Sequence, residues 1–181
     1  MSWILPFPDS QITGHYGTLS DYRKAKGMQP HSGTDWAAKT GTLIPAIASG
    51  KVVLIQWSNI LGWVVVQTAT DNKGKLWYLG YCHLTCSQHK DNCKGDHESP
   101  LTTTKVGDEV KVGQKYLRIG NTGSASTGAH LHATASKTVK GVFGVTSAKV
   151  DLYKLILANQ QEAKKTTKAV KTCPTCKQEV K

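Results

Sequence analysis

The chain has 181 residues, of which 39% are hydrophobic and 19% charged. This composition fits one folded domain and excludes a disordered, collagen-like or coiled-coil chain. Lys and Arg total 23 against 12 Asp and Glu, a net charge of +11, so we expect attraction to polyanions. No stretch approaches the roughly 20 apolar residues of a membrane span. The first ten residues (MSWILPFPDS) lack the basic start of a signal peptide, so we expect synthesis in the cytoplasm.

Short β-rich runs fill the chain up to about residue 145. Glycine and proline separate them, and the runs predict strands at 42–47, 51–57, 63–69, 75–84, 109–112, 116–119 and 130–135. The polar residues 71–74 (DNKG) lie between two runs and predict a hairpin turn, in which Gly74 can adopt a positive φ. The sequence therefore predicts a mainly β fold with a mostly antiparallel sheet.

The rest of the chain is polar or helical. Residues 86–105 have little periodicity and predict a long inserted loop. Apolar residues follow Asp151 at helical spacing and predict one short C-terminal helix over about 151–162. Residues 163–181 hold six lysines and predict an exposed basic tail. We therefore expect one domain over residues 1–160, followed by a basic tail over 161–181.

The chain has five cysteines, and this odd number is not the pattern of a disulfide-rich secreted mini-protein. Four of them lie in the predicted loop and tail. Three states stay open for these four: a disulfide, a second, structural zinc site with cysteine ligands, or free thiols. The four residues are Cys86, Cys93, Cys173 and Cys176.

Three segments contain histidine in positions that could bind a metal: HSGTD (31–35), YCHL (81–84) and HLH (130–132). If the last segment is a strand, its period of two places His130 and His132 on one face and Leu131 on the other. The same alternation turns Cys82 away from the face that His83 uses. Each segment taken alone is also explained by a chance scatter of surface histidines.

Two neutral imidazoles and a carboxylate suit zinc and leave a fourth position for water. The metal lowers the pKa of that water to about 7. His31 and Asp35 lie on a turn that contains proline and glycine, which can bring an imidazole and a carboxylate toward one point. With these two residues and His132 as ligands, His83 and His130 would remain available as acid and base.

Together the three segments resemble peptidase family M23, the lysostaphin-like and LytM-like zinc peptidases. HSGTD is similar to the family's HxxxD element, HLH to its HxH element and YCHL to its Tyr-x-His-Leu strand. The context is similar as well, in the segments 14–17 (GHYG), 106–114 (VGDEVKVGQ) and 120–128 (GNTGSASTG). The resemblance covers about residues 5–157, and the insertion of about twenty residues after YCHL departs from the family.

The resemblance implies an M23-like antiparallel β fold and a Zn²⁺ ion bound by His31, Asp35 and His132. It implies that His130 is the general base acting on water, and that His83 orients this water or stabilises the tetrahedral intermediate. The implied activity is zinc-dependent endopeptidase hydrolysis of peptide bonds in the stem or cross-bridge of bacterial peptidoglycan.

The resemblance, combined with the missing signal peptide, predicts a phage endolysin. We expect a monomer, made in the host cytoplasm, that reaches the cell wall after holin release or from the virion. The expected partners are peptidoglycan and anionic wall polymers, an attraction that salt should weaken. No basic-aromatic motif for nucleic acid is evident. The alternative is a catalytically inactive M23-like module with a cell-wall-binding or virion structural role.

Overall fold

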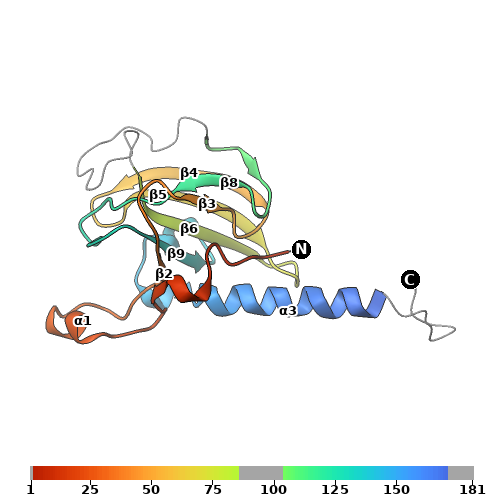
Figure 1. Ribbon diagram of the computed structural model, residues 1–181, viewed down its shortest axis with the longest axis horizontal. Helices are drawn as coiled ribbons and strands as arrows, with labels where there is room; N and C mark the ends of the chain where they lie inside the picture. The colour runs from red at the N-terminus through yellow and green to blue at the C-terminus, as the bar shows by residue number, and fades with distance from the viewer. Residues whose placement is uncertain (1, 86–103, 171–181) are drawn as a thin grey trace.

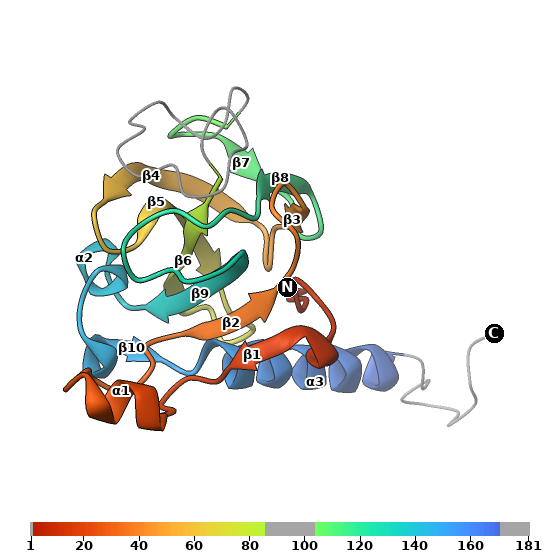
Figure 2. The ribbon, with the colours of Figure 1, turned by 60° about the vertical axis from the view of Figure 1, so that its left-hand side comes forward.

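An eight-stranded antiparallel sheet forms the centre of the protein, in a computed structural model that describes residues 2–85 and 104–170. The strand order is β1-β2-β9-β6-β5-β4-β7, and β10 pairs with β9 (Figure 2). A two-stranded sheet of β3 and β8 adjoins it. The strands are β1 (Ile12–Gly14), β2 (Thr34–Ala37), β3 (Leu43–Pro45), β4 (Gly50–Ser58), β5 (Gly62–Thr70), β6 (Leu76–Leu84), β7 (Glu109–Val110), β8 (Lys115–Arg118), β9 (His130–Ser136) and β10 (Lys149–Val150).

The mainly β, antiparallel prediction is confirmed, because each of the predicted strands is present with shifts of a few residues at its ends. Three strands were not predicted: β1, β2 and β10. Each of them is only two to four residues long, too short to show a period of two. The omission of β2 matters, because this strand carries Asp35. The expectation that His31 and Asp35 share one turn is therefore wrong for Asp35.

The predicted hairpin turn between β5 and β6 is confirmed. Gly74 has φ of 78°, a conformation that favours glycine. Asp71 stabilises the turn, since its Oδ1 accepts hydrogen bonds from the amides of Lys73 and Lys75, and its Oδ2 accepts one from the indole of Trp77. The turn therefore helps to fix the register between β5 and β6.

The sheet has two faces with different functions. The main core packs on one face and includes Trp36, Leu79, Tyr81 and Leu131, all fully buried. On the other face a small cluster of Val64, Val66, Cys82 and Val142 packs beside the three histidine segments. Alternation along β9 thus buries Leu131 in the core and leaves its neighbouring histidines on the opposite face, as predicted.

Short helical segments lie before or between the strands. They are α1 (Asp21–Ala25), α2 (Val139–Val142) and the 3₁₀ turns η1 (Asp9–Gln11) and η2 (Thr146–Ala148). Helix α2 packs directly on β6, and a Cβ at Gly80 would lie 2.3 Å from Cγ1 of Val142. Gly80 is therefore required for this close approach.

Helix α3 (Leu152–Val170) is longer than the short helix predicted over 151–162, and it continues through the expected domain boundary at 160/161. Leu152 and Ile156 are fully buried against the core. Asn159 anchors the helix to the β5–β6 turn, because its Oδ1 accepts a hydrogen bond from the amide of Asn72. Both ribbon views show α3 along one side of the sheet, with its C-terminal part extending beyond it (Figures 1 and 2). No helix in the described part of the chain is long and apolar enough to span a membrane.

Cys86, Cys93, Cys173 and Cys176 lie outside the described residues. The three states that the sequence leaves open for them stay open. Cys82 lies within the described part of the chain, where it is a buried free thiol.

Candidate metal centre and active site

The pairing of β2 with β9 places a carboxylate directly opposite an imidazole. Asp35 is the register partner of His132, and side chains at directly opposed positions lie on the same face of the sheet. Oδ1 of Asp35 is 2.7 Å from Nδ1 of His132. His31, in the loop before β2, completes the cluster: its Nε2 is 3.0 Å from Oδ2 of Asp35 and 3.1 Å from Nδ1 of His132.

Backbone contacts orient the two imidazoles. Nδ1 of His31 is 3.1 Å from the carbonyl oxygen of His15, and because a carbonyl only accepts, Nδ1 carries the proton and Nε2 presents a lone pair to the cluster. Nε2 of His132 is buried without a hydrogen-bond partner among the described residues, so this ring contacts its neighbours through Nδ1. Glycine at position 14 makes room, since a Cβ there would lie 2.8 Å from Oδ2 of Asp35.

The electrostatics favour unprotonated donors. Burial alone would raise the pKa of Asp35, but the neighbouring imidazoles of His132 and His31 outweigh it and hold that pKa well below its usual range. Burial lowers the pKa of His132. Metal ligands must be deprotonated carboxylates and neutral imidazoles. One oxygen and two nitrogens, all within 4.8 Å of one another, therefore fit the donor set of a zinc site with an open position.

His130 lies two residues before His132 on β9 and beside this cluster. Its Nδ1 donates to the carbonyl of Gly128 at 2.7 Å, which leaves Nε2 as the basic nitrogen. That Nε2 is 3.8 Å from Oδ1 of Asp35. The side chain of His130 is 16% exposed, against 6% for His31 and His132. A basic nitrogen therefore faces the metal position from its more open side.

His83 reaches the same place through an irregularity in β6. It has φ of 57°, the left-handed region, and the pairing of β5 with β6 shifts register beside it. Cys82 is the register partner of His132 and lies on the same face. The prediction that alternation separates Cys82 from His83 is therefore wrong, because the strand does not alternate regularly at this point.

The surroundings of His83 keep it neutral. Burial, followed by the nearby His132 and His130, lowers its pKa to about 3. Its Nδ1 donates to the carbonyl of Thr122 at 2.8 Å, and its ring centroid is 4.8 Å from that of His130. Thr122 is fixed in turn by its hydroxyl, which donates to the carbonyl of Leu84 at 2.7 Å. The ring of His83 is therefore held with Nε2 as an acceptor.

Two open hollows flank Asp35. One has a volume of about 200 Å³ and lies against Thr13, Gly14 and His31; the other, about 340 Å³, lies against Gly128, Ala129 and His130. Both include Asp35 in their walls. An extended ligand laid from one hollow to the other would therefore cross this carboxylate and pass the candidate metal position.

Thus the structure brings together all five candidate residues predicted from the histidine segments. The sequence did not predict that the main-chain carbonyls of His15, Gly128 and Thr122 hold the imidazole rings in place. Their positions were marked only indirectly, by the segments 14–17 and 120–128. No local signal could assign them, because backbone carbonyls from any residue type can accept these hydrogen bonds.

Comparison with known proteins gives the family. The model of peptidase family M23 matches residues 29–143, a range that contains all five candidate residues. The chain belongs to peptidase family M23. M23 enzymes are metallopeptidases that use zinc, and His31, Asp35 and His132 form a group in the described part of the chain that could hold the ion.

Three relatives illustrate this membership. Lysostaphin of Staphylococcus simulans is 35% identical over 124 residues, which are 63% of this chain and 21% of the relative. The structure of the lysostaphin catalytic domain aligns with a TM-score of 0.57 at 27% identity, and the alignment covers 80% of this chain and 89% of that one. Glycyl-glycine endopeptidase ALE-1 of Staphylococcus capitis is 33% identical over 124 residues, 63% of this chain and 29% of the relative. The catalytic domain of the prophage-encoded M23 protein EnpA from Enterococcus faecalis aligns with a TM-score of 0.55 at 29% identity, covering 80% and 91%.

The chain therefore spans less than a third of the length of these curated relatives. What it shares with them is the M23 catalytic unit.

Replacing a metal ligand should weaken zinc binding at this cluster without unfolding the chain. We expect His31→Ala and His132→Ala to weaken zinc affinity by more than about 100-fold, beyond the cost of losing an outer-shell partner. His130→Ala should keep the zinc content of the wild type. Chelator competition and elemental analysis would measure this, with circular dichroism to confirm folding. Wild-type zinc affinity in folded His132→Ala would rule out this cluster as the site.

The buried neutral His83 should make stability depend on pH. Its pKa is about 3 in the folded protein, below the ordinary 6.5, so between these values the unfolded state binds more protons and the free energy of unfolding falls as pH falls. At pH 5 this amounts to about 2 kcal/mol. Urea unfolding of metal-free protein at pH 7 and 5 should show this loss in wild type and not in His83→Gln.

His15→Gln, a change at an exposed histidine, is the control and should behave like wild type. An equal pH dependence in wild type and His83→Gln would contradict the neutral state of His83.

Proposed function

We propose that the chain is a zinc-dependent endopeptidase that hydrolyses peptide bonds of bacterial peptidoglycan. The observation that carries the proposal is the convergence of three metal donors with two further histidines, His83 and His130, beside the two open hollows that flank Asp35. The printed activity of the relative ALE-1, a glycyl-glycine endopeptidase, supports a peptide substrate of this type.

The metal-binding residues and His130 have separate roles in the proposed reaction. When bound to His31, Asp35 and His132, zinc supplies Lewis acidity toward water and toward the amide carbonyl. Nε2 of His130 faces this position and accepts the proton of the attacking water, since its Nδ1 is committed to Gly128. The same imidazolium can then protonate the leaving amine.

His83 acts on the water rather than on the developing negative charge. Its Nδ1–H is committed to Thr122, and its pKa of about 3 keeps the ring neutral. Nε2 can then accept a hydrogen bond but cannot donate one. Of the two roles implied by the family resemblance, orientation of the attacking water therefore fits this residue.

Replacing His130 separates metal binding from catalysis. His130→Ala should retain zinc and lose at least about 100-fold in the rate of hydrolysis of purified peptidoglycan, the usual contribution of a general base. Appearance of new amino groups would measure the rate. The variant should still sediment with cell walls at low salt, since the net charge of +11 attracts anionic wall polymers.

Full hydrolysis by zinc-loaded His130→Ala would reject this residue as the base. No hydrolysis by wild type, with wall binding retained, would favour the alternative of an inactive wall-binding or virion structural module.

A phage lysin is the biological role that we propose for this activity. The similarity to the catalytic domain of the prophage-encoded protein EnpA supports it. In this role the enzyme is made in the host cytoplasm and meets the wall after holin release or from the virion.

Expression of the chain in a bacterium with a susceptible wall tests the endolysin form of this role. Cells should lyse when a phage holin is co-expressed and should grow normally without it, and His130→Ala with holin is the control that should not lyse. Lysis without holin would contradict dependence on holin release.

A further inference from the structure

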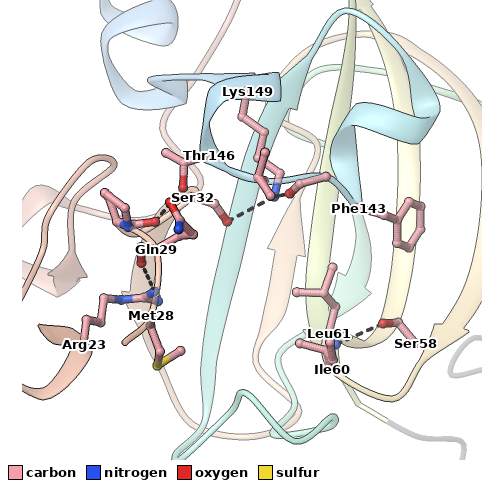
Figure 3. A pocket seen from close by; sticks show the side chains of 13 residues that line it. Arg23, Met28, Gln29, Ser32, Ser58, Ile60, Leu61, Phe143, Thr146 and Lys149 are labelled. Atoms are coloured by element: carbon pink, nitrogen blue, oxygen red, sulfur yellow. Dashed lines mark hydrogen bonds between the residues drawn. The ribbon is translucent and has the colours of Figure 1, made fainter. Parts of the chain in front are cut away.

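A third cavity lies beside the candidate metal centre and has no part in the chemistry described above. It has a volume of about 400 Å³ and lies between the segments 23–32, 58–61 and 143–149. Ser32, which directly follows the candidate ligand His31, forms part of its wall. Figure 3 shows side chains from all three segments around one common space. The cavity is therefore placed to hold groups of a substrate that also reaches the metal centre.

A buried cation lies in the wall of this cavity. Lys149 on β10 is only 6% exposed, and its Nζ donates to Oγ of Ser32 at 3.0 Å and to the carbonyl of Gly144 at 2.8 Å (Figure 3). An ammonium has three N–H donors. One donor is therefore left for a further acceptor.

Lys149 has no carboxylate partner in the part of the chain that the structure describes. Across residues 2–85 and 104–170, no carboxylate lies within 4.0 Å of its Nζ. Buried charges in proteins are normally paired, because an unpaired one loses its hydration without compensation. Burial accordingly lowers the pKa of Lys149. An anion supplied from outside the chain would complete the site.

The mouth of the cavity is apolar, in contrast to the charged wall. Met28, Ile60 and Val145 line it with exposures of 38%, 61% and 61%. Large apolar side chains that are exposed together mark a surface that binds a partner or ligand. Arg23 adds a second cation to the lining, and its guanidinium donates to the carbonyl of Gln29. The cavity therefore combines alkyl contacts at its mouth with positive charge.

Hydrogen bonds between the loops hold these walls in place. The hydroxyl of Thr146 donates to the carbonyl of Pro30 at 2.6 Å, and the hydroxyl of Tyr16 contacts the carbonyls of Thr146 and Lys149 at 3.1 Å each. The cavity is thus formed before any ligand arrives, which lowers the entropic cost of binding.

We propose that this cavity is a carboxylate subsite: it binds a free carboxylate of the substrate peptide to Lys149 and short alkyl side chains to the apolar mouth. The inference rests on the proposed function for the identity of the polymer. It adds a substrate class, because a neutral glycine chain would leave the buried cation unpaired whereas a carboxylate-bearing peptide pairs it. The enzyme therefore selects peptides with a free carboxylate.

Binding of two small peptides tests the subsite without hydrolysis. The probes are N-acetyl-alanyl-D-alanine and its C-terminal amide, titrated into zinc-loaded wild type, Lys149→Met and Lys140→Met by nuclear magnetic resonance. Wild type should bind the acid at least about tenfold more tightly than the amide, the effect of one hydrogen bond between charged groups. Lys149→Met should lose this preference, whereas Lys140→Met, at an exposed lysine on α2, should keep it.

Two results would overturn the subsite. Equal binding of acid and amide to wild type, including no detectable binding of either, would do so. A preference that persists in Lys149→Met would place the carboxylate on the metal instead. If Lys149 had only a structural function, Lys149→Met would melt at a much lower temperature. Neither wild type nor Lys149→Met would then prefer the acid over the amide.

Hydrolysis of peptidoglycan fragments, before and after chemical amidation of their carboxyl groups, separates this inference from the proposed function. Amidation should lower kcat/KM for wild type about tenfold and leave that of Lys149→Met unchanged. Cleavage of both fragments at equal rates by wild type would overturn the subsite and leave the endopeptidase intact. Cleavage of neither, together with selective binding of the acid, would reject the endopeptidase and leave the carboxylate site standing.

Discussion

The register between β2 and β9 is the constraint on which the site depends. It sets Asp35 opposite His132, and the 2.7 Å contact between them defines the point at which His31 and His130 also arrive. Because side chains alternate along a strand, a slip of one residue would exchange the core residue Leu131 for a histidine. The burial of Leu131 therefore stabilises the fold and the metal centre through the same strand pairing.

The imidazoles depend on the backbone as much as on one another. Three imidazoles donate Nδ1–H to a main-chain carbonyl. His31 donates to His15, His130 to Gly128 and His83 to Thr122. These bonds determine which ring nitrogen keeps its lone pair, so the loops assign the rings of the site their separate functions. On the same face, Lys149 reaches the loops next to His31 without a carboxylate partner in the described part of the chain, which gives the cleft a cation near its metal donors.

Much of this arrangement could be predicted from sequence, and the failures have physical causes. The long strands, and the position of His130 and His132 on one face of β9, follow from the alternation of core-facing and outward-facing side chains. The position of Asp35 on a strand could not be predicted, because a four-residue strand shows its period only when its partner is known. The orientation of His83 depends on a positive φ at a non-glycine residue, which long-range packing imposes against local preference. The burial of Lys149 could not be predicted, since a buried lysine and a surface lysine look alike in sequence.

Zinc-dependent hydrolysis is tested most directly by mass spectrometry of purified peptidoglycan after incubation with the protein as purified, after chelation, and after zinc is restored. We expect new peptide amino termini in the first and third samples and none in the second, and the masses would identify the bond. Equal cleavage in all three samples would contradict the metal centre. Unchanged peptidoglycan in all three, across several wall chemistries, would contradict the endopeptidase.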